Sequence, residues 1–354
     1  MKTTIIISAG GTGGHIFPAL AVAKQLQDSY NIIWVGAKIG LENKLVPEHG
    51  FRLETVSVAG VRNKCLLRKL MLPFTLLRAH WECLRICLKH RPALVVGFGG
   101  YATFPISLTA KLLGKSVVIH EQNSVAGLTN RLLAKIANKV LVAFPNVLPS
   151  SKTHLVGNPV REEIIAIDRS TTKLSENPPA IKILVIGGSL GAKVLNDNLP
   201  LALAKLDTKF AQIRHQVGRA AIEPIVEAYQ ANLVKHVQVV NFIDDMAAAY
   251  AASDLIICRA GASTVAEVAA AGIAAIFVPY PYAVDDHQTV NTRQLVAAGA
   301  AILLPQAELN PIKLSELISS LNYASCQNMG KKARSLAILD STQQICQQII
   351  EQLK

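Results

Sequence analysis

Strand-like segments alternate with helical patterns along the whole chain. The strand candidates lie at residues 3–8, 32–35, 94–96, 117–119 and 140–142 in the first half, and at 181–186, 212–217, 237–240, 255–257, 274–278 and 301–304 in the second. Short, mostly apolar runs separated by helices are typical of strands buried on both faces of a parallel sheet. The pattern therefore predicts an α/β fold in which crossover helices connect parallel strands.

Both halves of the chain begin with the same succession of elements. The run 3–8 leads into the glycine-rich segment 9–15 and a helical stretch at 17–27, and the run 181–186 leads into glycine-rich 187–192 and another helix. Strand, glycine loop and helix in this order open a Rossmann-like domain. We therefore expect two Rossmann-like domains, each with a parallel sheet, facing one another across a cleft.

The length of the chain also requires two domains. It has 354 residues, of which 51% are apolar, and single cores stop growing at about 250–300 residues. The polar, proline-bearing segment 168–180 is the best linker. We place an N-terminal domain at 1–162, a C-terminal domain at 163–340, and a last helix at 341–354 that packs back on the N-terminal domain.

The positive charge is confined to one half of the chain. Residues 1–160 contain 19 Lys and Arg against 6 Asp and Glu, whereas residues 161–354 contain 17 against 18. Such asymmetry indicates an anionic partner for the N-terminal half, either a nucleic acid or an anionic membrane surface. The basic half lacks interleaved aromatic residues and any recognition-helix pattern, so we expect no nucleic acid partner.

Cysteine usage and the N-terminus predict a cytoplasmic protein. The six cysteines lack a Cys-x-x-Cys pair and stand in apolar surroundings, as expected of reduced thiols. Glycines interrupt the first apolar run at once, so it does not form the continuous apolar region of a signal peptide. The longest uncharged stretches, 93–110 and 268–284, both contain Gly and Pro, and we expect neither to cross a membrane.

The loop from Gly10 to His15 is the first candidate for chemistry. A glycine loop between strand and helix lets backbone N–H groups and the positive end of the helix approach a phosphate. The spacing is imperfect for a dinucleotide fingerprint, and no acidic residue ends the second strand, where Val35 to Lys38 stand. These features argue against an oxidoreductase. The alternative is that the glycines serve only tight packing.

Six motifs together resemble one family from end to end. They are Gly10 to His15, Gly97 to Tyr101, His120 to Asn123, Gly157 to Arg161, Gly187 to Ala192 and Arg259 to Glu267. In this order they resemble the bacterial peptidoglycan N-acetylglucosaminyltransferases, the MurG family. The resemblance implies the GT-B glycosyltransferase fold and inverting transfer of N-acetylglucosamine from its UDP donor to undecaprenyl-pyrophosphoryl-N-acetylmuramoyl-pentapeptide, which turns lipid I into lipid II. It implies no cofactor and no metal.

The resemblance also implies a donor site. Arg161 and Ser189 would hold the diphosphate, Glu267 would accept from a ribose hydroxyl, Ile243 would contact uracil, and Gln288 would bind the sugar. The whole donor set comprises Thr12, Gly13, Gly14, Asn123, Arg161, Ser189, Ile243, Ala262, Ser263, Thr264, Val265, Ala266, Glu267 and Gln288. Two alternatives stay open: Glu267 is also placed for a capping box, and Ile243 for ordinary core packing.

Inversion requires a base for the acceptor 4-hydroxyl, and two residues qualify. His15 ends the first glycine loop, and imidazole titrates near neutral pH. Glu121 lies at the carboxyl end of a strand, and open α/β sheets bind ligands at the carboxyl ends of their strands. The acceptor set implied by the resemblance is Gly10, Gly11, Gly99, Gly100 and Tyr101.

The segment 62–91 joins basic and apolar residues. It holds eight Lys and Arg against the single acid Glu82, with apolar residues spread widely between them. Its His80, Cys83, Cys87 and His90 could ligate zinc by type, but on one helix the outer pair would lie about 15 Å apart, which excludes one shared ion. We expect peripheral attachment to the cytoplasmic face of the plasma membrane, the alternative being core packing with basic rims.

Two other classes of protein would share some of these features. A UDP-N-acetylglucosamine 2-epimerase, or a glycolipid transferase with another acceptor, would share the fold. The loops Gly10 to His15 and Gly97 to Tyr101 argue against the epimerase. A nucleic-acid-binding module would explain the basic half, but the chain lacks an RNA-binding signature and a recognition-helix pattern.

Overall fold

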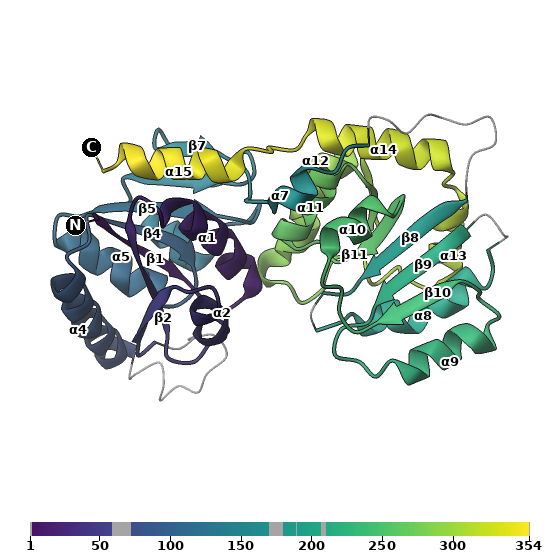
Figure 1. Ribbon diagram of the computed structural model, residues 1–354, viewed down its shortest axis with the longest axis horizontal. Helices are drawn as coiled ribbons and strands as arrows, with labels where there is room; N and C mark the ends of the chain where they lie inside the picture. The colour runs from purple at the N-terminus through teal and green to yellow at the C-terminus, as the bar shows by residue number, and fades with distance from the viewer. Residues whose placement is uncertain (1, 59–71, 170–179, 189, 207–209, 354) are drawn as a thin grey trace. The chain divides into compact units, whose positions relative to one another are not determined.

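The computed structural model describes residues 2–58, 72–169, 180–188, 190–206 and 210–353. Contacts divide the chain into two compact units. The first unit is Met1–Val160 together with Ile338–Lys354, and the second unit is Arg161–Ala337. Each contains one sheet of parallel strands with helices on both faces (Figure 1).

The sheet of the first unit has seven strands in the order β3-β2-β1-β4-β5-β6-β7. Their bounds are β1 (Thr4–Ala9), β2 (Asn31–Ala37), β3 (Arg52–Val56), β4 (Leu94–Gly99), β5 (Ser116–Glu121), β6 (Lys139–Val142) and β7 (Thr153–Leu155). The order reverses between β1 and β4, which pair in parallel. Open α/β sheets bind ligands at the carboxyl ends of strands beside such a reversal.

Six described helices cover this sheet. They are α1 (Gly13–Leu26), α2 (Glu42–Glu48), α4 (Leu72–His90), α5 (Thr103–Leu112), α6 (Leu128–Leu133) and α15 (Ser341–Glu351). Ile5 and Ile7 of β1 pack in a core with α1 and α15, while Ile6 packs in a second core with α4 and α5. Successive side chains of a strand point to opposite faces, so covering both faces explains the continuous apolar run of β1.

The last helix of the chain is part of the first unit. Ile345 and Ile349 are fully buried in the same core as α1, and Cys346 is nearly so. On β6, Lys139 Nζ donates to Gln348 Oε1 at 2.6 Å and to Glu351 Oε2 at 2.5 Å. The chain thus returns to its first sheet after completing the second unit.

The second unit repeats the architecture with six strands in the order β10-β9-β8-β11-β12-β13. The strands are β8 (Ile181–Ile186), β9 (Phe210–Gln216), β10 (Val237–Val240), β11 (Leu255–Cys258), β12 (Ala274–Phe277) and β13 (Ala301–Leu303). The helical segments are α7 (Glu162–Ile165), α8 (Lys193–Leu203), α9 (Glu223–Ala231), α10 (Met246–Ala251), α11 (Ala262–Ala271), η1 (Val284–Asp286), α12 (His287–Ala297), α13 (Pro311–Ser319) and α14 (Tyr323–Ser335). The order reverses between β8 and β11.

All eleven strand candidates correspond to strands of the structure, but the pattern missed β3 and β7. Both are edge strands. β3 is only partly buried over most of its length, and β7 has three residues, none of them buried. Edge strands with polar residues carry little hydrophobic signal.

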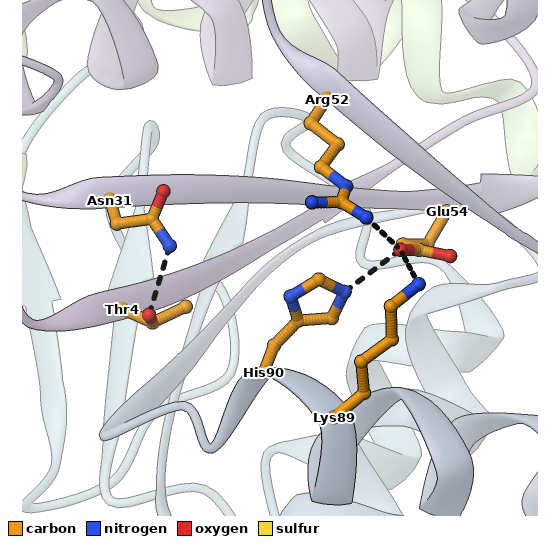
Figure 2. Close-up of polar contacts among 6 residues, drawn as sticks. All are labelled: Thr4, Asn31, Arg52, Glu54, Lys89 and His90. Carbon is orange, nitrogen blue, oxygen red and sulfur yellow. Dashed lines mark hydrogen bonds and ion pairs between the residues drawn. The ribbon is translucent and has the colours of Figure 1, made fainter.

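Charged residues join the edge strand β3 to the end of α4 (Figure 2). Glu54 Oε1 accepts hydrogen bonds from Lys89 Nζ at 2.9 Å and from His90 Nε2 at 2.8 Å, and Arg52 Nη2 lies 3.5 Å away. Partial burial alone would raise the pKa of Glu54, but the hydrogen bonds from Lys89 and His90 outweigh it and lower the pKa below its usual value. The cluster holds the amphipathic helix α4 to the sheet.

Helix α4 has one buried and one exposed apolar side. Ala79, Cys83 and Cys87 are buried, whereas Phe74, Leu77, Trp81 and Leu88 are 59–67% exposed. Burial raises the pKa of the Cys87 thiol to about 11, so it is protonated at neutral pH. The basic and apolar segment predicted at 62–91 is described only from residue 72 onward, because residues 62–71 lie outside the described residues. Within the described ranges, no helix is long and apolar enough to cross a bilayer.

Candidate functional site

A buried carboxylate supports the glycine loop between β1 and α1. Glu42 is 1% exposed, and its Oε2 accepts from Gly11 N at 3.1 Å while its Oε1 accepts from Ala37 N at 3.0 Å. A Cβ atom on Gly10 would lie 2.4 Å from Glu42 Oε1, so a larger residue there would displace the Glu42 carboxylate. None of the sequence motifs predicted this role for Glu42. Gly36 and Gly40, which leave room for its side chain, were the available signal.

The loops after β1 and β4 pack backbone against backbone. Gly10 N donates to Gly99 O at 3.2 Å. Gly99 and Gly100 have φ angles of 112° and 97°, and a Cβ on Gly100 would lie 2.6 Å from Gly10 O. The predicted acceptor glycines therefore lie together at the reversal point of the sheet, with Tyr101 53% exposed beside them.

The first turn of α1 presents backbone donors at the same place. Thr12 precedes the helix with an extended backbone and makes no capping hydrogen bond through its side chain. The N–H groups of a first helical turn lack partners within the helix and carry partial positive charge. Gly13 and Gly14 occupy this turn, which makes it suited to an anionic group.

His15 stands in that turn with one ring nitrogen already engaged. Its Nδ1 lies 2.9 Å from Gln122 Oε1, and a Cβ on Gly99 would lie 2.8 Å from the imidazole ring. Close packing over Gly99 and a hydrogen bond to Gln122, the residue directly after β5, therefore fix the ring. Within the described part of the chain, Nε2 has no hydrogen-bond partner.

Glu121, the other candidate base, has both oxygens occupied. Oε1 accepts from Asn123 N at 3.0 Å and from Asn123 Nδ2 at 3.3 Å. Oε2 accepts from Gly127 N at 3.1 Å and from Asn130 Nδ2 at 2.9 Å. The carboxylate is 1% exposed and shapes the turn that carries Asn123.

In the second unit, the glycine loop after β8 packs closely on the loop after β9. Gly188 and Gly191 have φ angles of 83° and 78°. A Cβ on Gly191 would lie 2.2 Å from Val217 O, so glycine is required for this approach. Ser189, predicted to bind the diphosphate, lies outside the described residues.

The N-terminus of α11 carries five of the predicted donor residues, Ala262, Ser263, Thr264, Val265 and Ala266. Gly261 precedes the helix and no side chain caps it. Ser263 Oγ is buried without a hydrogen-bond partner in the region that the structure describes. A buried hydroxyl in this condition is uncommon and fits a place where a ligand completes the hydrogen bonding.

Glu267 of α11 binds Arg161 rather than the start of its own helix. Its Oε1 accepts from Arg161 Nη2 at 2.9 Å and from Nε at 3.2 Å, and its Oε2 accepts from the Tyr250 hydroxyl at 3.2 Å. The capping-box alternative for Glu267 is therefore not what the structure shows. Burial raises the pKa of Glu267, although Arg161 and Tyr250 oppose the shift.

Gln288 joins the loops that follow β11 and β12. Its Oε1 accepts from Ala260 N at 3.3 Å and from Tyr280 N at 2.9 Å. The carboxamide nitrogen is the part of this side chain left to donate to a ligand. Ile243 is 1% exposed, so the protein itself encloses its side chain.

Comparison with known proteins identifies the family. Residues 5–142 match the model of the glycosyltransferase family 28 N-terminal domain, and residues 182–352 match that of its C-terminal domain. The chain belongs to glycosyltransferase family 28. This membership confirms the predicted glycosyltransferase class and the predicted GT-B fold of two Rossmann-like units.

Relatives within family 28 match the chain over nearly its full length. The Ralstonia nicotianae protein is 49% identical over 350 residues, covering 98% of this chain and 95% of the relative. The Dechloromonas aromatica protein is 49% identical over 354 residues, covering 99% of each chain. Both are named UDP-N-acetylglucosamine–N-acetylmuramyl-(pentapeptide) pyrophosphoryl-undecaprenol N-acetylglucosamine transferase.

A solved family 28 structure agrees with these relatives. The crystal structure of Acinetobacter baumannii MurG has a TM-score of 0.88 and 42% sequence identity, covering 99% of this chain and 100% of that chain.

Within the described ranges of this chain, no group of three or more His, Cys, Asp or Glu side chains could hold a metal ion.

Proposed function

We propose that this chain transfers N-acetylglucosamine from UDP-N-acetylglucosamine to the 4-hydroxyl of the muramoyl sugar of lipid I, giving lipid II. The observation that carries the proposal is 49% identity over nearly the full chain to transferases named for this reaction. The matched region therefore includes both units and the glycine loops between their strands and helices. The predicted function agrees with these relatives.

The second unit is proposed to bind the donor. The first turn of α11 offers backbone donors and the unpartnered Ser263 hydroxyl to a phosphate or ribose group. Arg161 and Glu267 offer a cation for the diphosphate and a carboxylate for ribose hydroxyls. The charge that develops on the leaving UDP is then met by protein donors, so we propose that transfer needs no metal ion.

The first unit is proposed to bind the acceptor and supply the base. His15 Nε2 would take the proton of the 4-hydroxyl as its oxygen forms a bond to the anomeric carbon and the bond from that carbon to UDP breaks. The contacts of the two candidates favour His15, because Glu121 already accepts four hydrogen bonds. The glycine loops that follow β1 and β4 would hold the acceptor pyrophosphate.

An apolar surface on α4 is proposed to hold the enzyme at the cytoplasmic face of the inner membrane. Phe74, Leu77, Trp81 and Leu88 are all more than half exposed, and Arg85 stacks over the Trp81 ring at 5.0 Å. Exposed aromatic and aliphatic side chains beside cations suit an anionic lipid surface. A lipid-linked acceptor makes this attachment useful, because it brings the enzyme to the layer where the substrate resides.

One assay tests the reaction. Purified protein is mixed with labelled UDP-N-acetylglucosamine and a lipid I analogue, with UDP-glucose as the control donor and EDTA in a parallel sample. We expect labelled disaccharide product from the first donor only, and little effect of EDTA. Conversion of the donor in the absence of acceptor would indicate an epimerase, and full loss with EDTA that manganese restores would contradict metal independence.

A further inference from the structure

A line of hydrogen bonds leads from the proposed base into the core of the first unit. His15 Nδ1 lies 2.9 Å from Gln122 Oε1, Gln122 Nε2 lies 3.0 Å from His120 Nδ1, and His120 Nε2 lies 2.9 Å from Gly157 O. His120 is fully buried and Gln122 is 1% exposed. The line therefore runs through the interior, where solvent does not compete for these groups.

The carbonyl oxygen of Gly157, at the end of the line, fixes the direction of each hydrogen bond in it. A carbonyl oxygen accepts only, so His120 Nε2 must carry the hydrogen that it donates to Gly157 O. Burial lowers the pKa of His120 to about 4, against the opposing effect of the Gly157 hydrogen bond, so the ring is neutral at neutral pH. The Nδ1 atom of a neutral ring protonated at Nε2 is an acceptor, and it takes a hydrogen from the Gln122 amide.

A second acceptor fixes the Gln122 amide in the same orientation. Its Nε2 also donates to the backbone oxygen of His120 at 3.2 Å. Both hydrogens of the NH2 group are then used, and a flipped amide would turn its oxygen toward two acceptors. Gln122 Oε1 must therefore face His15, whose Nδ1 has to be the donor.

We propose that Gln122 and His120 are positioning residues that hold His15 in the tautomer protonated at Nδ1, leaving the Nε2 lone pair for the acceptor hydroxyl. The inference rests on the proposed function only in assigning His15 as the base. Neither residue touches the reacting atoms. They act by fixing which ring nitrogen carries the proton, as the orienting group does for other catalytic histidines.

Backbone and side-chain contacts hold the far end of this line. Asn158 Nδ2 donates to Gln122 O at 2.9 Å, and Gly157 has a φ angle of 77°. A Cβ on Gly157 would lie 2.4 Å from Ser341 Oγ, so the first residue of α15 packs directly on this turn. The Phe98 ring lies 5.4 Å from the His120 ring, centroid to centroid. The line of hydrogen bonds therefore ends on a turn that packs against the start of α15.

Two substitutions of Gln122 test the proposal. Gln122→Leu keeps the approximate size but cannot accept from His15. Gln122→Glu, with its buried carboxyl protonated, keeps one oxygen to accept from His15 Nδ1 and an O–H to donate to His120 Nδ1. We expect Gln122→Leu to lower kcat about 100-fold with little change in KM for either substrate, within the range that a general base contributes. Gln122→Glu should retain most of kcat. Gln25→Leu, which removes an exposed glutamine from α1, is the matched control.

Nitrogen NMR of the histidine rings reads the tautomer directly and does not depend on activity. The ring signals are assigned with His15→Asn and His120→Gln variants. We expect His15 protonated at Nδ1 in the unmodified protein and in Gln122→Glu, and a mixture of tautomers in Gln122→Leu. The expected tautomers in a protein without transferase activity would support the hydrogen-bond line and overturn the proposed function instead.

Three results would overturn the inference. The first is a His15 ring protonated at Nε2 in the unmodified neutral protein. The second is a Gln122→Leu variant with an unchanged kcat. The third is a Gln122→Leu variant that loses kcat while His15 stays protonated at Nδ1, since the loss would then come from something other than the tautomer. If Gln122→Leu does not fold, the spectra of the unmodified protein and Gln122→Glu still decide.

Discussion

Arg161 and Glu267 form an ion pair inside the second unit, with Arg161 Nη2 2.9 Å from Glu267 Oε1. The two residues are 106 positions apart, and each was predicted from the motifs to bind a different part of the donor. The carboxylate also accepts from the Tyr250 hydroxyl at 3.2 Å. A phosphate that approached Arg161 would therefore meet a cation whose charge Glu267 already balances, which links the two proposed donor contacts.

The first prediction concerns this linkage. Arg161→Ala should lower kcat/KM for UDP-N-acetylglucosamine by about 10- to 100-fold, because a charge-assisted hydrogen bond contributes about 1.5–3 kcal/mol. Adding Glu267→Gln should cost less in this background than alone, since contacting residues couple by about 0.5 kcal/mol or more. Initial rates of the single and double variants measure the coupling. Arg219→Ala, at an exposed arginine, is the control, and strictly additive effects would contradict the prediction.

The second prediction concerns the carboxylate under the first glycine loop. Glu42→Ala leaves the N–H groups of Gly11 and Ala37 without their acceptor. We expect the free energy of unfolding of the first unit to fall by about 2–4 kcal/mol, since each buried unsatisfied group costs about 1–3 kcal/mol. Thermal unfolding measures this loss, and the KM for the acceptor should rise as the loop loosens. Glu48→Ala, at an exposed position on the same helix, is the control, and an equal effect of both variants would refute the role of Glu42.

The third prediction concerns the pH dependence of stability. Folding lowers the pKa of Glu54 below its usual value, so its stabilising contribution is complete above the unfolded pKa and disappears as pH falls through the folded pKa. Glu54→Gln should therefore lower Tm at pH 7, and its difference from the unmodified protein should shrink as the pH falls below about 4. Melting curves across this range measure it, with Glu227→Gln at an exposed position of α9 as control. A difference that grows on acidification would have the wrong sign.

The fourth prediction concerns the exposed surface of α4. Leu77→Ser with Trp81→Ser removes two apolar side chains that are 67% and 59% exposed. Binding to anionic vesicles should weaken by about tenfold or more, because burying one large apolar side chain contributes about 1.5–3 kcal/mol. Sedimentation with vesicles measures binding, and transfer to a soluble acceptor should stay nearly unchanged. Leu201→Ser, at an exposed leucine of α8, is the control. If the double variant binds vesicles normally but unfolds at a lower temperature, Leu77 and Trp81 contribute to core packing and not to membrane binding.

The sequence by itself determined the α/β class, the presence of two similar units and the positions of eleven of the thirteen described strands. These features depend on local periodicity, because a buried strand and a crossover helix each show their pattern within a few residues. The glycine loops were also visible, since they follow a strand and precede a helix in both units. Two edge strands were missed because an edge strand does not need a continuous apolar run.

Only the tertiary structure decided which residues meet. The Glu42 carboxylate lies under Gly11 from 31 residues away, and His15 meets Gln122 from 107 residues away. Lys139 meets Glu351 across 212 residues, which brings the last helix back to the first sheet. The physical reason is that hydrophobic periodicity specifies which face of an element is buried, whereas polar pairs form between neighbours set by sheet order and loop geometry. The direction of the hydrogen bonds from His15 through Gln122 and His120 to Gly157 depends on those neighbours. So does which nitrogen of His15 is proposed to act as a base.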